Sequence, residues 1–232
     1  KPLRRLDASL LADLPPFSGM SREALDDMLA RAVSFRSAKD AYVFREGEEA
    51  HSFFLLLDGY VRVVKVTPDG EQVIVRYIAT GELLGIARAI GRDTYPANAV
   101  AAVDCVLLAW PSNAWDAIVA AHPGFATNTY SMVGSRLVGT QDRVELATER
   151  VEQRVANAIL SLARETGRKT DEGILIDFPI SRQDISEMTG TTLHTVSRLL
   201  SGWDSKGWIK GGRQKITLVE GHKLMMVASA RD

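Results

Sequence analysis

Three changes of pattern along the 232 residues predict an α+β fold. Short β-rich runs separated by turn residues occupy residues 33–110, which is typical of a barrel or a sandwich. The stretch 125–151 contains no proline and repeats apolar residues at helical spacing. Two shorter helical patterns around a glycine then precede a basic hairpin. We therefore expect a β-barrel domain over 1–122, a long helix over 123–151 and a helical domain with a hairpin over 152–232.

Composition agrees with a globular protein and excludes several kinds of site. Hydrophobic residues make up 46% of the chain, and no apolar run approaches the roughly 18 residues of a membrane span. The one cysteine, Cys105, cannot form an internal disulfide or a four-cysteine zinc or iron–sulfur site. We therefore expect a cytoplasmic protein with no iron–sulfur cluster and no membrane partner.

The net charge of −1 combines two unlike parts. Residues 1–149 carry 15 Lys and Arg against 19 Asp and Glu, a net charge of −4, whereas residues 150–232 carry 13 against 10, a net charge of +3. Basic charge at one end of a chain favours a nucleic-acid partner there. Because the positive charge of residues 150–232 is small, the sequence motifs have to show whether this part binds nucleic acid.

The N-terminal part begins with a short helix and continues as strands. Ser21 can cap a helix over 21–32. Asp69-Gly70 between two β-branched runs predicts a hairpin. A helix over 113–121 follows the last strand. The expected strands are 41–44, 53–57, 60–66, 72–78, 97–103 and 106–110.

The long helix carries a seam of residues that alternate in spacing between four and three, one of them polar. At about 1.5 Å per residue the helix reaches roughly 40 Å, and an apolar stripe of that length needs a cover. A second copy of the chain is the expected cover, which predicts a homodimer, and packing on its own barrel is the alternative. The seam consists of Val133, Leu137, Thr140, Val144, Ala147 and Val151.

The C-terminal part contains two helices joined by a tight turn. Ser181 can cap a helix over 181–189, with Asp184 at the capping-box position. Thr189-Gly190-Thr191 forms the turn, and a second helix covers 192–205. This order is typical of a helix-turn-helix motif. Before it we expect a helix over 152–166 and a strand over 174–178.

The second of these helices has polar and charged side chains near its start, where a recognition helix touches base edges in the major groove. The hairpin after it carries Lys210, Arg213 and Lys215, which suit the DNA backbone. The alternatives are a solvated helical hairpin and a regulatory module that binds a partner protein through this surface. The expected contacts with double-stranded DNA are Arg182, Thr192, His194, Thr195, Ser197, Arg198, Lys210 and Arg213.

Together these features resemble the CRP/FNR family of bacterial transcription regulators over nearly the whole chain. The matching segments are Gly81-Glu82-Leu83-Leu84-Gly85, Ser181-Arg182-Gln183-Asp184-Ile185 and Leu193-His194-Thr195-Val196-Ser197-Arg198. The resemblance implies a cyclic-nucleotide-binding-like jelly roll, a dimerisation helix, a winged helix-turn-helix and RNA polymerase as a partner. An enzyme is not expected, because the sequence has no Gly-Lys-Ser/Thr loop, no paired metal-ligand spacing and no nucleophile–base set.

The resemblance also implies a DNA sequence. The FNR-like branch reads a half-site beginning TTG with a Glu-x-x-Ser-Arg face, which implies a palindromic TTG-N-CAA-like site for a dimer. Ser197 and Arg198 fill the last two places of that face, and Arg198 is the expected bidentate partner of guanine O6 and N7. His194 stands where relatives have Glu, so the base read there is left open.

In cyclic-nucleotide-binding relatives the barrel cassette ends in Arg-Ser/Thr-Ala, and the arginine neutralises the cyclic phosphate. Here the cassette ends in Tyr95-Pro96-Ala97, so binding of a cyclic nucleotide is not expected. A cyclic-nucleotide-responsive regulator stays as the alternative. The expected effector-pocket residues are Glu82, Tyr95 and Pro96.

This variant of the cassette resembles the nitric-oxide-responsive NnrR/DNR-like branch, which implies an activator of denitrification or nitric oxide response genes. Its members are thought to use haem, which needs an axial ligand. Haem is therefore the candidate cofactor, and His51, in the loop before a strand, is the first choice of ligand. Cys105 lies inside an expected strand and is interpreted as a buried small hydrophobe.

Overall fold

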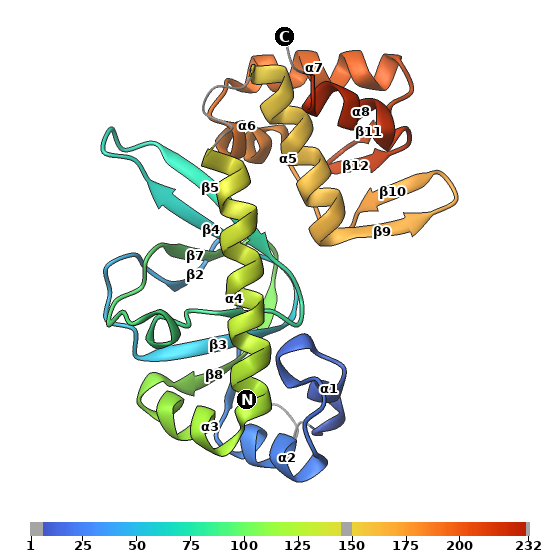
Figure 1. Cartoon of the computed structure of the whole chain (residues 1–232). Coiled ribbons are helices and arrows are strands. Elements are labelled where there is room, and N and C mark those ends of the chain that lie inside the picture. The colour runs from blue at the N-terminus through green and yellow to red at the C-terminus, as the bar shows by residue number, and fades with distance from the viewer. Residues whose placement is uncertain (1–6, 145–149, 231–232) are drawn as a thin grey trace. The chain divides into compact units, whose positions relative to one another are not determined.

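The structure is a computed structural model that describes residues 7–144 and 150–230, with the side chains of 136–144 outside the description (Figure 1). The chain divides into two compact units. The first comprises Lys1–Val64 and Ile78–Gln141, and the second comprises Lys65–Tyr77 and Asp142–Asp232.

Most of the described helices and strands lie where the sequence predicts them. The α-helices are α1 Ser9–Ala12, α2 Arg22–Ala30, α3 Trp115–Ala121, α4 Pro123–Val144, α5 Val151–Thr166, α6 Arg182–Thr189, α7 Leu193–Ser205 and α8 Gly221–Ala228. Single 3₁₀ turns are η1 Pro15–Phe17, η2 Arg88–Ile90 and η3 Ser112–Ala114. The strands are β1 Val33–Ser37, β2 Tyr42–Phe44, β3 Ser52–Asp58, β4 Val61–Val66, β5 Gln72–Ile78, β6 Leu83–Leu84, β7 Asn98–Ala101, β8 Cys105–Pro111, β9 Gly167–Thr170, β10 Gly173–Ile176, β11 Ile209–Gly212 and β12 Lys215–Leu218.

The N-terminal strands form two four-stranded sheets in the described part of the chain, in the orders β1-β8-β3-β6 and β2-β7-β4-β5. Neighbours such as β3 and β8 run antiparallel, with Phe54 opposite Ala109. The predicted α+β class is confirmed, and the strands predicted to form one barrel divide between two sheets.

Strand β3 is buried on both faces, which shows how the first unit is layered. Phe53 and Leu55 pack with Trp110 in a core beneath the helices. The alternate residues Phe54 and Leu56 pack in a second core that includes residues of both sheets. Because successive side chains of a strand point to opposite faces, one strand serves both cores.

The predicted long helix does not continue unbroken to Val151. Helix α4 begins at Pro123, at a helical position where a missing backbone N–H costs little. Arg150 has extended backbone (φ −61°, ψ 149°), and its N–H donates to Gln153 Oε1 at 2.7 Å. Val151 is therefore the first residue of α5. The expectation of one helix over 125–151 is wrong at this end, because the chain leaves the helical conformation at Arg150.

The second unit places four helices against a sheet in the order β11-β12-β10-β9, as far as its described residues show. Val155, Ile159, Ile185, Val196 and Trp203 are buried in it. The two strands of the predicted hairpin, β11 and β12, pair with Gly212 opposite Lys215. The predicted helix-turn-helix and wing are confirmed as structural elements.

Candidate DNA interface

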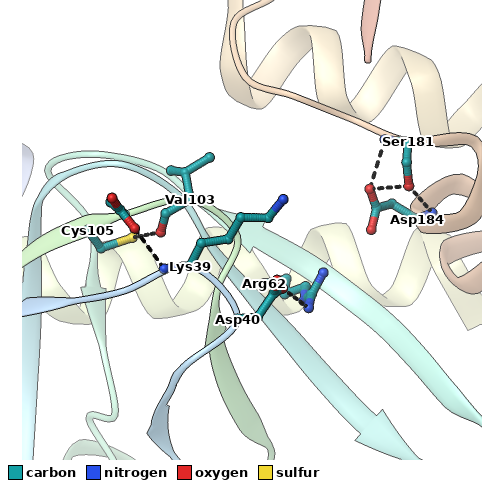
Figure 2. Close-up of polar contacts among 8 residues, drawn as sticks. Lys39, Asp40, Arg62, Val103, Cys105, Ser181 and Asp184 are labelled. Carbon is teal, nitrogen blue, oxygen red and sulfur yellow. Dashed lines mark hydrogen bonds and ion pairs between the residues drawn. The ribbon is translucent and has the colours of Figure 1, made fainter. Parts of the chain in front are cut away.

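Ser181 and Asp184 fix the start of α6 (Figure 2). The Ser181 hydroxyl accepts a hydrogen bond from the Asp184 backbone N–H at 3.0 Å. The Asp184 carboxylate accepts from the Ser181 N–H at 2.8 Å and from its hydroxyl at 2.6 Å. The predicted capping box is confirmed, and it satisfies backbone donors that the first turn leaves without partners. A carboxylate therefore occupies this helix end, and the neighbouring Arg182, a predicted DNA contact, is exposed.

The turn between the two helices depends on glycine. Gly190 has left-handed backbone (φ 59°, ψ 39°), and its N–H donates to the Ser186 carbonyl. Such a residue ends a helix at little cost only when it lacks a Cβ. Thr192 then caps α7, because its hydroxyl accepts from the Thr195 N–H at 3.2 Å. The two threonine hydroxyls are 3.0 Å apart and bond to each other. These two hydrogen bonds fix the first turn of α7 in the protein alone.

Helix α7 presents one apolar and one polar face. Val196, Leu200 and Trp203 are buried. His194 and Arg198 are exposed and four residues apart, so they lie on one face of the helix. Neither side chain makes a hydrogen bond or an ion pair within the residues that the structure describes. Their donors are available to base edges.

The cationic side chains of the wing differ in whether they form an ion pair. Arg213 is exposed beside Gln214, which has a left-handed backbone (φ 57°) at the hairpin tip. Lys210 Nζ lies 2.6 Å from Glu172 Oε1 in the β9–β10 turn. Both side chains are about 60% exposed, so the pair is weak and a phosphate can compete for the lysine.

A groove of about 460 Å³ lies between the start of α6, helix α7 and the wing. Its lining includes Arg182, Arg213 and Lys215 together with apolar residues such as Leu193, which is 47% exposed. Lys210 is not among the lining residues. The structure thus brings two of the predicted DNA contacts, Arg182 and Arg213, to one groove beside α7.

The predicted effector-pocket residues have structural partners. Tyr95 is 5% exposed, and its ring stacks on Phe44 with centroids 4.0 Å apart. Its hydroxyl donates to the Ser52 carbonyl at 2.7 Å, and burial raises the pKa of the phenol. The Glu82 carboxylate accepts from the Ala79 N–H at 3.2 Å, and Pro96 is half-buried. Tyr95 therefore fills part of the core, which leaves the effector pocket a prediction.

The aromatic core around Tyr95 also explains a glycine in the matched cassette. Gly85 has left-handed backbone (φ 68°), and a Cβ there would lie 3.1–3.2 Å from the rings of Phe44, Phe54 and Tyr95. Glycine is needed for both reasons.

His51, the predicted haem ligand, lies at the surface. Its side chain is 76% exposed, and its Nε2 is 3.7 Å from Glu49 Oε2. A haem ligand is ordinarily held in a pocket whose polarity and access the protein controls. His51 has no such enclosure among the described residues, so the residues present do not fit the group at this position.

Cys105 is buried, as its apolar setting in the sequence predicts. It is 2% exposed, and its thiol lies 3.2 Å from the Val103 carbonyl (Figure 2) and 3.3 Å from the Tyr60 carbonyl. Burial raises the pKa of the thiol, which disfavours the reactive thiolate. Within the described residues no group of three His, Cys, Asp or Glu is placed to hold a metal ion.

The predicted dimer seam is described only in part. Val133 is half-buried and packs partly against the core of its own unit. The side chains of Leu137, Thr140 and Val144, and the whole of Ala147, lie outside the described residues. Val151 lies on α5, so it cannot continue the α4 seam on the same helix. The homodimer stays a prediction. No described helix is both long enough and apolar enough to cross a membrane.

Two family models match the two parts of the chain. The model described as a cyclic nucleotide-binding domain matches residues 35–122, and the model described as a Crp-like helix-turn-helix domain matches residues 153–227. A sandwich of this type followed by a winged helix-turn-helix defines a DNA-binding transcription regulator.

Known proteins resemble the chain over most of its length. The Global nitrogen regulator of Synechocystis sp. is 28% identical, over 92% of this chain and 95% of its own. The Fumarate and nitrate reduction regulatory protein of Escherichia coli is 24% identical, over 89% of this chain and 82% of its own. The structure of FixK2 from Bradyrhizobium japonicum superposes with a TM-score of 0.75 at 24% identity, covering 87% of this chain and 99% of that one. The chain belongs to the CRP/FNR family of transcription regulators.

Proposed function

We propose that two copies of this chain bind a palindromic TTG-N-CAA-like duplex and regulate transcription from it. The observation that carries the proposal is the exposed Arg198 on α7, which has no partner within the described residues. A guanidinium has parallel donors that match guanine O6 and N7 in the major groove. Ser197 lies next to it and is half-buried, which suits a short contact with the neighbouring thymine.

Backbone contacts complete the proposed interface. Arg182 and Arg213 line the groove beside α7, where their charges can pair with phosphates on the strand that flanks the recognition helix. Such contacts release counterions, so affinity should fall steeply with salt. They position the protein, whereas Arg198 and His194 select the sequence.

The proposed dimer rests on the outward surface of α4. Tyr130 precedes Val133 at the spacing of the seam and is 48% exposed. An exposed aromatic ring in register with the predicted seam of a long helix suits packing against a second copy of the same helix. A two-fold pair of recognition helices then demands a palindrome.

Titration of the chain against palindromic, single-half-site and scrambled duplexes tests this proposal. We expect two protomers per palindrome and an affinity at least roughly a thousand-fold above that for the scrambled duplex at physiological salt. Equal affinity for the palindrome and the scrambled duplex contradicts the proposal. Absence of duplex binding even at low salt favours instead a module that acts on a partner protein.

We also propose that the chain activates denitrification or nitric oxide response genes through contact with RNA polymerase. The support is the resemblance of the Tyr95-Pro96-Ala97 cassette to the NnrR/DNR-like branch and the nitrogen-related names of both relatives. Because His51 does not fit an enclosed haem site, no step is assigned to haem. Duplex binding measured anaerobically with and without nitric oxide tests the response, and unchanged affinity contradicts it.

A haem titration of the wild type and of His51→Ala tests His51 as the haem ligand. If the wild type shows no Soret shift, or if the variant shows the same shift, His51 is not the ligand.

A further inference from the structure

A side-chain hydrogen bond from Arg154 of α5 reaches the last residue of α6, directly before the turn of the helix-turn-helix. Arg154, in the second turn of α5, donates from Nε to the backbone carbonyl of Thr189 at 3.0 Å. Thr189 is the last residue of α6 and is 7% exposed. The contact is partly buried and joins residues 35 positions apart in the sequence.

The chemistry of this contact suits a structural link. The last carbonyls of a helix have no partner inside the helix, and they carry the negative end of its dipole. A guanidinium supplies both a donor and a positive charge at this place, which makes the bond stronger than one between neutral groups. The backbone N–H groups of Gly190 and Thr191 both donate to the Ser186 carbonyl, so these bonds tie the turn only to α6. Arg154 instead anchors the turn to a different helix.

Helix α5 also contacts the sheet that carries the wing. It packs on β10 and β9, and β10 pairs with β12 of the wing. The chain of contacts therefore runs from the wing through α5 and Arg154 to the turn that precedes the recognition helix. Helix α7 also packs directly on β11 of the wing. The orientation of α7 relative to the wing therefore has two supports, this packing and the attachment of the preceding turn to α5.

We infer that Arg154 is a positioning residue that orients the recognition helix so that α7 and the wing contact one duplex at the same time. The inference rests on the proposed DNA binding. It gives Arg154 no contact with DNA: the residue acts through the Thr189 carbonyl. Without the guanidinium, α7 would keep its base contacts while the wing would no longer reach its phosphates.

The dependence of affinity on salt separates this role from a purely structural one. The slope of log affinity against log salt reports how many phosphates the protein touches, and partial unfolding lowers the active fraction without changing that slope. We expect Arg154→Met to lower affinity roughly ten-fold and to reduce the slope by about one for each phosphate that the wing no longer touches. Preference at each base of the half-site should stay as in the wild type.

Two further variants sharpen the test. Arg164→Met is the matched control on α5, because that guanidinium bonds to Ser161 Oγ within the same helix, at 3.4 Å; it should leave affinity and slope unchanged. Arg213→Ala should reduce the slope as Arg154→Met does, and the double variant should lower affinity by less than the sum of the two separate effects.

Arg154→Met with a wild-type salt slope overturns the inference. If that variant does not fold, Arg154→Gln carries the test, because its side chain is shorter and carries no positive charge; an unchanged slope in it overturns the inference equally. A wild-type chain that shows no sequence-specific duplex binding contradicts the proposed function itself, so the two failures are distinct.

Discussion

The polar side chains at the start of α7 differ in whether they already form hydrogen bonds within the protein. The Thr192 hydroxyl bonds to the hydroxyl and to the backbone N–H of Thr195. His194 and Arg198 are instead exposed and have no partner among the described residues. A side chain that is already bonded must give up that bond to read a base. The exposed pair is therefore the better source of sequence selection.

His194→Ala should change the preferred base at one position of each half-site, while the palindrome stays preferred to a scrambled duplex. A neutral imidazole can donate or accept, so its removal costs one contact, worth about 1–3 kcal/mol at that base pair. A panel of single-base substitutions in the half-site measures it, with His222→Ala on α8 as control. Uniform loss of affinity across the whole panel would contradict a base-reading role.

Cys105 should resist thiol reagents until the protein unfolds. It is 2% exposed, and burial raises the pKa of its thiol, so little thiolate is present and the reagent cannot reach it. Labelling followed with and without denaturant checks this. Native protein that labels as fast as unfolded protein would contradict the assignment of Cys105 as an inert core residue.

At the scale of elements, each helix of the DNA-binding motif begins at a side-chain cap. Ser181→Ala removes the hydroxyl that caps α6 and should lower the free energy of unfolding of the second unit by about 1 kcal/mol. Urea unfolding measures the change. Ser201→Ala on α7 is the matched control, because Ser201 is exposed and its hydroxyl has no partner in the described structure. Equal stability of the two variants would contradict the capping role.

A hydrogen bond connects α2 to the residue before α4. His122 Nε2 lies 2.9 Å from Asp27 Oδ2, and Arg31 lies 3.1 Å from the same carboxylate. The hydrogen bond to His122, followed by that to Arg31, lowers the pKa of Asp27 below its ordinary value of 3.8. A carboxyl with a lowered pKa in the folded state stabilises the protein above its unfolded pKa and loses that contribution as the pH falls through its folded pKa.

Asp27→Asn should therefore lower the urea midpoint at pH 7, and the difference from wild type should shrink as the pH falls below about 4. The effect should be modest, because the Asp27 side chain is 39% exposed and solvent screens it. Asp26→Asn, an exposed neighbour on the same helix, is the control. A gap between Asp27→Asn and wild type that widens towards pH 3 would contradict the assigned sign.

At the scale of the whole molecule, patterned elements were predictable and unpatterned ones were not. Alternation and turn residues located most of the sandwich strands, and Ser181, Gly190 and the wing glycines marked the motif. Strands β1, β6 and β9 and helices α1 and α8 were missed. Strand β6 has two residues, β9 is mostly exposed and polar, and neither helix has a side-chain cap. Their pairing depends on neighbours distant in the sequence, such as β1 on β8.

The residues of the site also differ in whether a local sequence pattern marks them. Arg198 and Arg213 could be predicted because each follows a local motif, whereas Arg154 could not, since its partner lies 35 residues away. The start of a separate helix α5 was missed, because no proline or glycine marks the non-helical residue Arg150. Tyr95 was predicted to line a pocket, and its burial against Phe44 follows from packing that no local pattern records.

The central claim is that Arg198 reads a guanine in each half-site of a palindrome. Titration of wild type and Arg198→Ala against the palindrome, with guanine or 7-deazaguanine at that position, tests it most directly, because the analogue lacks the N7 acceptor. We predict that wild type loses affinity on the analogue, that Arg198→Ala binds both duplexes equally weakly, and that this variant no longer prefers the palindrome to a scrambled duplex. An Arg198→Ala protein that still discriminates between guanine and its analogue, or still selects the palindrome, would contradict the account.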